Sequence, residues 1–272
     1  MKKIGLVVKL DEKAAQKANE LEEYLKSKNF EVIKKDNSPA PSNLSYIFVL
    51  GGDGTFLNAV RWTAKQSIPI FGIKFGEVGF LAEITEESLF EAVDLILNNK
   101  YLLSNRIRLS VNVIQEKKNI LCETVLNELV ISKGALSKLI NIKTYINDHY
   151  LTTYRADGLI ISTPTGSTAY SLAAGGPILH PEVPGIVMTP ICPFTLTNRP
   201  LIVPDSVKIK LCVEKKSSPI SLSFDGQTNF EIDSSHKVII TQSPYPVHMI
   251  TLPSQNYFDI LKAKLRWSGG RV

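Results

Sequence analysis

The first hundred residues alternate short apolar runs with stretches of helical periodicity. Residues 4–8 have the length and composition of a buried strand. Residues 12–28 carry apolar side chains at spacings of three and four, which predicts an amphipathic helix. Further strands are expected at 31–33, 46–50 and 70–73, and further helices at about 56–65 and 86–97. This alternation is typical of a mostly parallel sheet covered by helices.

The pattern changes after Asn98-Asn99, because residues 108–250 are mostly β-rich runs separated by turn signals. We therefore expect an α/β domain at 1–100, to which a helical tail within 254–272 returns, and an all-β, β-sandwich-like domain at 101–253. The expected strands of the second domain are 109–114, 124–131, 142–146, 159–162, 207–213, 220–224 and 238–241, with hairpin turns at Asn147-Asp148 and Asp225-Gly226 and one short helix at about 167–174.

Composition places the chain among ordinary globular proteins, with 272 residues, 44% hydrophobic and 21% charged. Disordered, collagen-like and disulfide-scaffold classes are excluded. The net charge of +5 is a weak indication of anionic ligands. Because the basic residues form no dense stripe, we expect no nucleic-acid partner.

Cysteine usage and the apolar runs indicate a cytoplasmic protein. The three cysteines, Cys122, Cys192 and Cys212, are odd in number and widely spaced, which argues against disulfides and a zinc site. The apolar run near the N-terminus ends at Lys9, too early for a signal peptide. No apolar segment reaches about 18 residues, so we expect no membrane span.

The most informative local feature is Gly51-Gly52-Asp53-Gly54-Thr55, directly after a predicted strand. Its glycines allow close backbone approach, so Gly51, Gly52, Gly54 and Thr55 could form a phosphate cradle. The chain contains neither a Walker A pattern nor a G-x-G-x-x-G pattern. A carboxylate beside phosphates indicates a general base for a hydroxyl, or a ligand for a bridging Mg²⁺. The structural alternative is that Asp53 caps the next helix.

A second feature is the segment 155–177, in which a strand leads into the turn Thr163-Pro164-Thr165-Gly166 and then into small residues. Helix N–H groups and several hydroxyls in one place would suit an anion or a ribose. An ordinary capped helix explains the Ser and Thr but not so many small residues in succession. We therefore expect close approach by a ligand or by another backbone segment.

Together these segments resemble the NAD kinase family, which phosphorylates NAD to NADP. The Gly-Gly-Asp-Gly-Thr loop alone is shared with 6-phosphofructokinases and with diacylglycerol and sphingosine kinases. Four further matches, in the family's order, are residues 72–81, Leu126-Asn127-Glu128, the segment 163–177 and Ser223-Phe224-Asp225-Gly226-Gln227. The matches span about residues 4–230.

The resemblance implies an α/β nucleotide-binding domain, a β-sandwich-like NAD-binding domain, and an active site between them that a neighbouring subunit completes. It implies ATP as the phosphoryl donor, Mg²⁺ bridged by the donor phosphates, and a homo-oligomer, either dimer or tetramer. Asp53 would accept the proton of the adenosine ribose 2′-OH, with Gly54 contacting NAD. Asn127 and Glu128 would hold the adenosine. The remaining NAD-binding residues would be Lys138, Arg155, Asp157, Thr168, Ala169, Tyr170, Ser171, Leu172, Ala173 and Gln227.

Three residues depart from the family pattern. Lys74 stands where Asn is typical and could alter a phosphate or ribose contact. Ala173 and Phe194 stand where Ser and His are common, and neither is expected to touch the chemistry. The departures leave the preference between NAD and NADH open.

Two alternative functions remain from the sequence. One is a kinase of a sugar phosphate or lipid that shares only the glycine-rich loop, and the other is a catalytically silent nucleotide sensor. The phosphoryl donor could also be another triphosphate or polyphosphate. The histidines have no metal-ligand spacing and are expected to be solvated or structural; they are His149, His180, His236 and His248.

Overall fold

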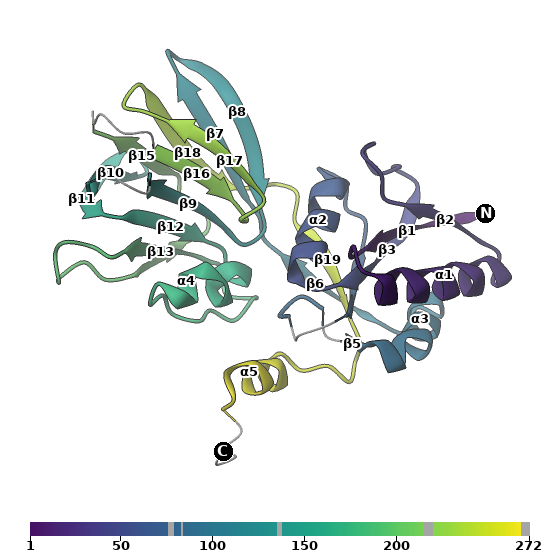
Figure 1. Cartoon of the computed structure of the whole chain (residues 1–272). Coiled ribbons are helices and arrows are strands. Elements are labelled where there is room, and N and C mark those ends of the chain that lie inside the picture. The colour runs from purple at the N-terminus through teal and green to yellow at the C-terminus, as the bar shows by residue number, and fades with distance from the viewer. Residues whose placement is uncertain (76–78, 83, 135–137, 215–219, 268–272) are drawn as a thin grey trace. The chain divides into compact units, whose positions relative to one another are not determined.

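The computed structural model describes residues 1–75, 79–82, 84–134, 138–214 and 220–267 (Figure 1). The chain divides into two compact units. The first comprises Met1–Asn105 together with the segment that starts at Val247, and the second comprises Arg106–Pro246. No helix in these described ranges has both the length and the apolar character needed to cross a membrane.

A largely parallel sheet forms the centre of the first unit. Strands β1 (Lys2–Val8), β3 (Leu44–Gly51) and β4 (Ile70–Lys74) pair side by side in parallel. The sheet order is β2-β1-β3-β4-β19-β6, with β5 paired to β4. The other strands are β2 (Phe30–Lys34), β5 (Ile84–Thr85), β6 (Leu102–Arg106) and β19 (Val247–Thr251). The order brings the carboxyl ends of β3 and β4 to neighbouring positions, because parallel strands end at the same edge.

Helix α1 (Glu12–Ser27) follows the predicted periodicity closely. Its start is capped by Asp11, whose side chain accepts the N–H of Ala14 at 2.9 Å. Its apolar side chains are buried in the core of the unit. The remaining helices of this unit are α2 (Asp53–Thr63), the 3₁₀ turn η1 (Glu86–Ser88), α3 (Leu89–Leu97) and α5 (Tyr257–Leu265).

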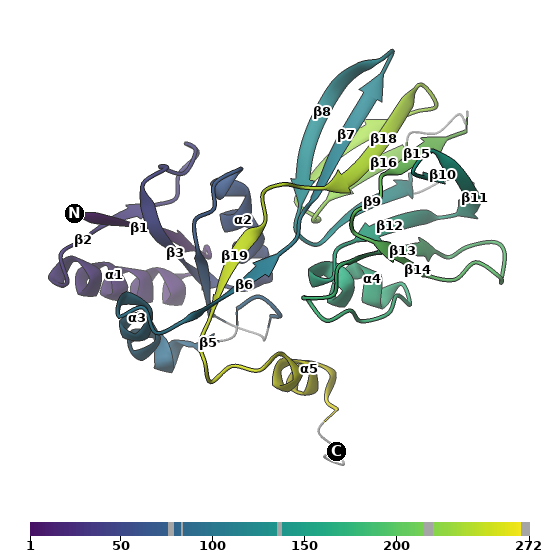
Figure 2. The same ribbon diagram turned by 180° about the vertical axis from the view of Figure 1, so that it is seen from behind.

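Two strands, β6 and β19, lie in the first sheet although their residues fall within the expected β-rich domain. Figure 2 shows β19 running beside β6, and the sheet order places β19 between β4 and β6. The expected boundaries at residues 100 and 254 therefore exclude both strands from the sheet that contains them. A strand's own sequence does not encode which sheet it joins.

The second unit is a sandwich of antiparallel sheets with a shared apolar core, which confirms the expected fold class. Its described strands form two sheets, ordered β11-β10-β15-β18-β7-β8 and β14-β13-β12-β9-β16-β17. The first contains β7 (Leu109–Gln115), β8 (Lys118–Val125), β10 (Ile140–Ile146), β11 (His149–Ala156), β15 (Ile209–Val213) and β18 (His236–Gln242). The second contains β9 (Glu128–Lys133), β12 (Gly158–Ser162), β13 (Gly185–Ile191), β14 (Leu201–Pro204), β16 (Ile220–Phe224) and β17 (Thr228–Ile232).

The local sequence predicted the turns of this unit more accurately than the ends of its strands. Both predicted hairpin turns are confirmed, since Asn147 (φ 48°) and Asp148 (φ 65°) are left-handed, as are Asp225 (φ 52°) and Gly226 (φ 63°). The expected single strand at 124–131 is wrong. The chain breaks between β8 and β9 at Leu126-Asn127, where it passes from one sheet to the other.

The buried position of β19 leads to a stability prediction. Met249 is 2% exposed, so Met249→Ala should lower the free energy of unfolding by about 2–5 kcal/mol through lost burial and a residual cavity. Leu102→Ala in the neighbouring strand β6 is the control, because Leu102 is 59% exposed and should cost little. Urea denaturation followed by circular dichroism measures both. Equal effects of the two variants would contradict the placement of β19 inside the first sheet.

Candidate functional site

The glycine-rich segment forms a strand end and a helix start rather than a loop. Strand β3 ends at Gly51, Gly52 is extended, and α2 begins at Asp53. The expected helix at 56–65 therefore starts three residues too late, because Gly54 in the first turn weakens the local helix signal. A carboxylate in the first turn is favourable beside the positive end of the helix dipole.

The Asp53 carboxylate is held by backbone N–H groups from a different segment. Phe80 donates its N–H to Oδ2 at 2.9 Å, and Leu81 donates to Oδ1 at 2.9 Å. A Cβ on Gly79 would overlap this carboxylate, so glycine is required there. Asp53 is thus not the helix cap that the structural alternative proposed. An ionised carboxylate has about four acceptor positions, so two remain for a ligand at this half-buried residue.

The glycines around Asp53 differ in what surrounds them. A Cβ on Gly51 would collide with the side chain of Thr55, whereas Cβ atoms on Gly52 and Gly54 would meet nothing within 4 Å. Neither Gly52 nor Gly54 is among the glycines with positive φ. Because neither packing nor backbone conformation requires glycine at these two positions, close approach by a ligand is the physical reason that remains.

The break at Leu126-Asn127 is stabilised by Asp225, which lies in the β16–β17 turn. Its carboxylate accepts the N–H groups of Leu126 at 2.8 Å, Asn127 at 2.7 Å and Glu128 at 3.0 Å. These donors lose their sheet partners where the chain changes sheets, and buried N–H groups need acceptors. Sequence reasoning assigned Asp225 only a turn role. Its place in the Ser-Phe-Asp-Gly-Gln match was the sequence signal that could have pointed to this structural role.

The hydroxyl-rich segment after β12 forms hydrogen bonds to the backbone at the same point, where the chain passes between the two sheets. Thr163 donates its hydroxyl to the carbonyl of Leu126 at 2.5 Å, and its N–H bonds the carbonyl of Asn127 at 2.9 Å. A Cβ on Gly166 would collide with the Asn127 backbone. The close approach predicted for this segment is therefore to another backbone. The short helices here are η2 (Thr165–Thr168) and α4 (Tyr170–Ala173).

The buried hydroxyl of Ser167 likewise serves the fold, since it donates to the Pro164 carbonyl at 2.6 Å and accepts the Leu179 N–H at 2.9 Å. The expectation that the hydroxyls of this segment converge on an anion is thus wrong for Thr163 and Ser167.

Glu128 is the most unusual acid of this region. It is 6% exposed, and its Oε2 has no hydrogen-bond partner among the described residues. Burial, with a smaller contribution from the charge of Asp225, raises its pKa to about 8. The side chain is therefore a neutral acid at pH 7, able to donate one hydrogen bond and accept others. An unsatisfied buried polar atom is costly, so Glu128 points to a ligand.

Arg108 is a buried cation that sequence reasoning missed. It is 1% exposed, its Nε donates to the carbonyl of Tyr245 at 2.6 Å, and its Nη2 lacks a partner in the described chain. Burial lowers the pKa of the guanidinium, and the charge of Asp225 opposes that shift. The Arg108 cation and the Asp225 carboxylate thus favour each other's charged forms.

A second group of predicted residues lies at the other end of β12. In the pairing of β12 with β9, Ser162 lies opposite Glu128 and Gly158 lies opposite Ser132. Five residues of strand span roughly 16 Å, which separates Asp157 from Glu128. Asp157 forms an ion pair with Lys133 at 2.8 Å, and Lys138 and Arg155 are exposed.

Phe194 belongs to this second group, against expectation. The Arg155 guanidinium lies over the Phe194 ring, 4.5 Å from its centroid. Phe194, which was expected to stay away from the proposed chemistry, thus contacts a residue that was expected to line the dinucleotide site. Because Phe194 stands where the family commonly has His, the ring beneath Arg155 is apolar and does not titrate.

The residues in and around α4 differ in how far they are exposed to solvent. Tyr170 is 47% exposed, and Ser171 is buried with its hydroxyl 2.8 Å from that of Thr189. Thr168, Ala169 and Leu172 are half-buried, and Ala173 and Gln227 are exposed. Gln227 lies in the β16–β17 turn, two residues after Asp225.

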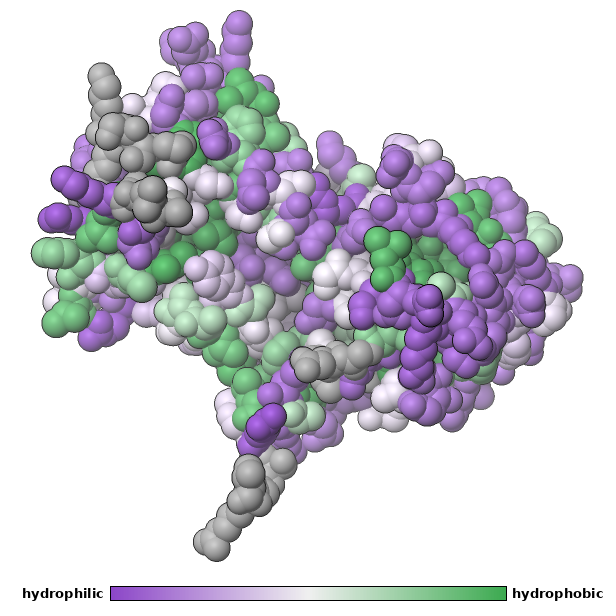
Figure 3. Space-filling model, viewed as in Figure 1, coloured by the Kyte–Doolittle hydropathy of each residue, from purple (hydrophilic) through white to green (hydrophobic). Residues whose placement is uncertain are grey.

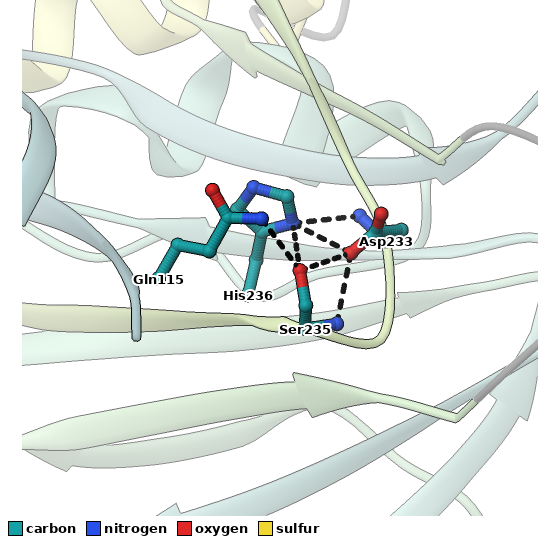
Figure 4. Close-up of polar contacts among 4 residues, drawn as sticks. All are labelled: Gln115, Asp233, Ser235 and His236. Carbon is teal, nitrogen blue, oxygen red and sulfur yellow. Dashed lines mark hydrogen bonds and ion pairs between the residues drawn. The ribbon is translucent and has the colours of Figure 1, made fainter. Parts of the chain in front are cut away.

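One cluster of Ser, His and Asp has the composition of a catalytic site but not its geometry. Figure 4 shows Asp233, Ser235 and His236 on a single turn, with Gln115 donating to the Ser235 hydroxyl at 2.8 Å. Asp233 Oδ1 accepts both the hydroxyl and the N–H of Ser235, at 2.6 and 2.8 Å, and lies 2.8 Å from His236 Nδ1. Chiefly these serine hydrogen bonds lower the pKa of Asp233 to about 2. The serine donates to the carboxylate, so the cluster stabilises a turn.

Among the described residues, no group of three or more His, Cys, Asp or Glu side chains is placed to hold a metal ion.

Family models match most of the chain. The ATP-NAD kinase N-terminal domain matches residues 37–101, and the ATP-NAD kinase C-terminal domain matches residues 126–252. A protein from Desulfatibacillum aliphaticivorans named NAD kinase is 48% identical over 284 residues, with 100% of both chains covered. An NAD kinase from Syntrophobacter fumaroxidans is 39% identical, covering 98% of this chain and 99% of that one.

Solved structures agree with the sequence relatives. Yeast NADH kinase complexed with NADH superposes with a TM-score of 0.91 at 25% identity, covering 100% of this chain and 89% of that one. An NAD kinase from Archaeoglobus fulgidus in complex with ATP gives a TM-score of 0.80 at 27% identity, covering 98% and 100%. Since both domain models match this chain, and a relative named NAD kinase is 48% identical over the full length, the chain belongs to the NAD kinase family.

Proposed function

We propose that this chain phosphorylates NAD at the 2′-hydroxyl of its adenosine ribose to give NADP, with ATP as the phosphoryl donor. The observation that supports this proposal most directly is the Asp53 carboxylate, which two backbone N–H groups hold in place. Beside it lie Gly52 and Gly54, at which neither packing nor backbone conformation requires glycine. The family relatives are named NAD kinase, and one structural neighbour is complexed with ATP.

In the proposed reaction, Asp53 is the general base. The 2′-oxygen of NAD attacks the terminal phosphorus of ATP, a new P–O bond forms, and the bond from that phosphorus to the bridging oxygen breaks. ADP leaves, and the hydroxyl proton passes to Asp53. Such transfers rest mainly on positioning and charge neutralisation. The two backbone hydrogen bonds supply positioning, because they fix both oxygens of the base.

Asn127 and Glu128 are proposed to hold the adenosine. Their backbone is fixed by Asp225 and Thr163, so their side chains start from a defined position. As a neutral acid, Glu128 can both donate and accept, which suits the mixed donors and acceptors of an adenosine. The residues around α4, together with Gln227, Lys138, Arg155 and Asp157, are proposed to line the rest of the dinucleotide.

The divalent metal is proposed to be Mg²⁺ carried on the donor phosphates. Mg²⁺ dehydrates reluctantly and usually binds through substrate phosphates with few protein ligands, so the donor phosphates would hold it and leave Asp53 free to act as the base. When bound, the ion would neutralise phosphate charge.

We further propose a cytoplasmic homo-oligomer. The free state of Cys122, Cys192 and Cys212 suits a reducing compartment. Several large apolar side chains of the second unit are exposed, including Phe194 at 65% and Leu196 at 84%, and Figure 3 shows hydrophobic surface on that unit. Exposed apolar surface of this kind favours association with another copy.

The basic test of the proposed activity is incubation of the purified protein with NAD, ATP and Mg²⁺, with NADP detected by an NADP-specific dehydrogenase. Fructose 6-phosphate and diacylglycerol serve as rival acceptors. NAD binding without NADP formation would instead identify a silent sensor.

Asp53→Asn tests the base. We expect kcat to fall by at least about a hundredfold while NAD binding, measured by calorimetry, stays within a few-fold. The asparagine amide nitrogen would face one backbone N–H, so one hydrogen bond is also lost, at about 1–3 kcal/mol. Gly79→Ala is the matched variant, because it displaces the carboxylate without removing it and should lower kcat as well. Near-normal turnover of Asp53→Asn would remove Asp53 from the base role.

Gly54→Ala tests whether the space beside Gly54 is occupied by a ligand, because the substitution should leave the fold intact. The added methyl meets no protein atom, and Ala is favoured over Gly inside a helix by about 0.5–1 kcal/mol, so the melting temperature should hold or rise. We expect kcat/KM for NADP formation to fall at least about tenfold, because the methyl occupies the space of the ligand. Asn58→Ala on the same helix is the control. Full activity of Gly54→Ala would argue against a cradle at this position.

Glu128→Gln tests the raised pKa. Between its ordinary value of 4.5 and about 8, the folded state keeps a proton that the unfolded state releases, so stability falls as pH rises through this window. The slope is at most about 1.4 kcal/mol per pH unit. The variant should lack this contribution, so its stability relative to wild type should increase from pH 5 to pH 8 in urea denaturation.

The exposed Glu231→Gln is the control and should leave the slope unchanged. At pH 7 glutamine also donates and accepts, so NAD affinity should stay within a few-fold, whereas Glu128→Ala should lose more than about tenfold. Parallel pH curves for wild type and Glu128→Gln would show that the acid is ionised in the folded protein.

A further inference from the structure

Arg108 is a buried cation that has no role in the mechanism described so far. Its side chain is 1% exposed, and a guanidinium keeps its charge inside proteins. Its Nε donates to the carbonyl of Tyr245, and its Nη2 has no hydrogen-bond partner among the described residues. A buried charge is normally paired with an opposite one, and a neutral carbonyl does not supply that charge. An anion near Arg108 is therefore expected.

The backbone of Arg108 lies beside the point where the chain passes from one sheet to the other. Leu109, the first residue of β7, pairs with Val125, the last residue of β8 (Figure 1). One step further along this register, Arg108 lies opposite Leu126. Opposite residues of an antiparallel pair are about 5 Å apart at Cα. Ser243 fixes this position, because its N–H bonds the Arg108 carbonyl at 2.8 Å.

The anion at this point is Asp225. Its side chain accepts the N–H of Leu126 at 2.8 Å, and the residue is 8% exposed. The other acid of the region, Glu128, is neutral at pH 7 because burial raises its pKa to about 8, so it brings no charge. Asp225 has to be ionised to accept at both oxygens, since protonation would turn one of them into a donor that faces an N–H group. A nearby cation favours the ionised form.

We propose that Arg108 is a positioning residue, whose charge keeps Asp225 ionised and thereby holds the backbone of Asn127 and Glu128 in place for the adenosine of NAD. The inference rests on the proposed function, which assigns the adenosine to these two residues. Asp225 accepts their N–H groups at 2.7 and 3.0 Å. Arg108 is too deeply buried to bind the ligand itself, so it acts through Asp225.

Two substitutions of Arg108 test the charge. Arg108→Met removes it, and Arg108→Lys keeps it. We expect the KM for NAD to rise about tenfold in Arg108→Met, because a protonated Asp225 loses an acceptor at the turn. In the same variant, kcat and the KM for ATP should stay within about twofold of wild type, since Asp53 belongs to the other unit. Arg108→Lys should keep the KM for NAD within about threefold of wild type.

Amide hydrogen exchange examines the turn without any substrate. By mass spectrometry, the peptide that contains Leu126, Asn127 and Glu128 should exchange at least about tenfold faster in Arg108→Met than in wild type. The same peptide of Arg108→Lys should exchange at the wild-type rate. Unchanged exchange in Arg108→Met, or equal effects of the two substitutions, would overturn the inference.

Val113→Ala is the matched control for a general loss of stability. Val113 is fully buried in the same strand, about 17 Å along from Arg108. This variant should unfold at a lower urea concentration, because a cavity remains in the core, and should leave the KM for NAD unchanged. A rise in the KM for NAD as large as that of Arg108→Met would mean that lost stability is the cause, and would overturn the inference.

A double-mutant cycle measures the pair directly. If the two charges interact, Arg108→Met combined with Asp225→Asn should lower the urea midpoint by less than the sum of the single variants. Should Arg108→Met alone not fold, the double variant should fold, because no uncompensated charge is left buried. Additive effects, or a double variant that does not fold, would overturn the inference.

The proposed function and this inference fail in different ways. Wild-type protein that makes no NADP would contradict the proposed function, and the exchange rates and the cycle would still report on the pair of charges. NADP formation by wild type together with an unaltered KM for NAD in Arg108→Met would contradict only this inference.

Discussion

The first unit depends on a carboxylate that joins two segments of chain. Asp53 at the start of α2 accepts the N–H groups of Phe80 and Leu81, and Gly79 leaves room for its oxygens. The bonds need an acceptor at both oxygens, which an ionised carboxylate provides and an amide does not. They connect the glycine-rich segment after β3 to the segment after β4, and both lie at the same edge of the sheet. The proposed base is thereby oriented before any substrate arrives.

The second unit uses the same device for a different purpose. The carboxylate of Asp225 accepts three successive N–H groups where the chain passes from β8 to β9. Without it, these donors would be buried and unsatisfied at a cost of about 1–3 kcal/mol each. Glu128 is destabilised as an anion in this arrangement, first because it is buried and second because the charge of Asp225 lies nearby. Its raised pKa is the consequence, and a neutral acid with a free oxygen is what the arrangement offers a ligand.

Glycine at positions 52, 54, 79 and 166 has three separate physical causes. Gly166 is required by the backbone of Asn127, and Gly79 by the carboxylate of Asp53. Gly52 and Gly54 are required by nothing in the fold, which is why they indicate a ligand. The three causes look alike in a sequence, since each appears as a small residue in a turn-like context. Only the distances from a hypothetical Cβ distinguish these causes. They show that Gly166 in the hydroxyl-rich segment supports the backbone of Asn127 rather than a ligand.

The sequence by itself determined the fold class, the helix periodicity, both left-handed hairpin turns and the family, because these follow from short-range pattern and from motifs in a fixed order. It also marked Asp53, Asn127 and Glu128 by residue type. The tertiary structure alone decided that β6 and β19 join the first sheet and that the run at 124–131 breaks. It also decided that Asp225 and Phe194 lie against predicted site residues and that Arg108 is buried near the charge of Asp225. Pairing between distant strands and burial of single side chains are long-range properties. Neither leaves a periodic trace in the local sequence.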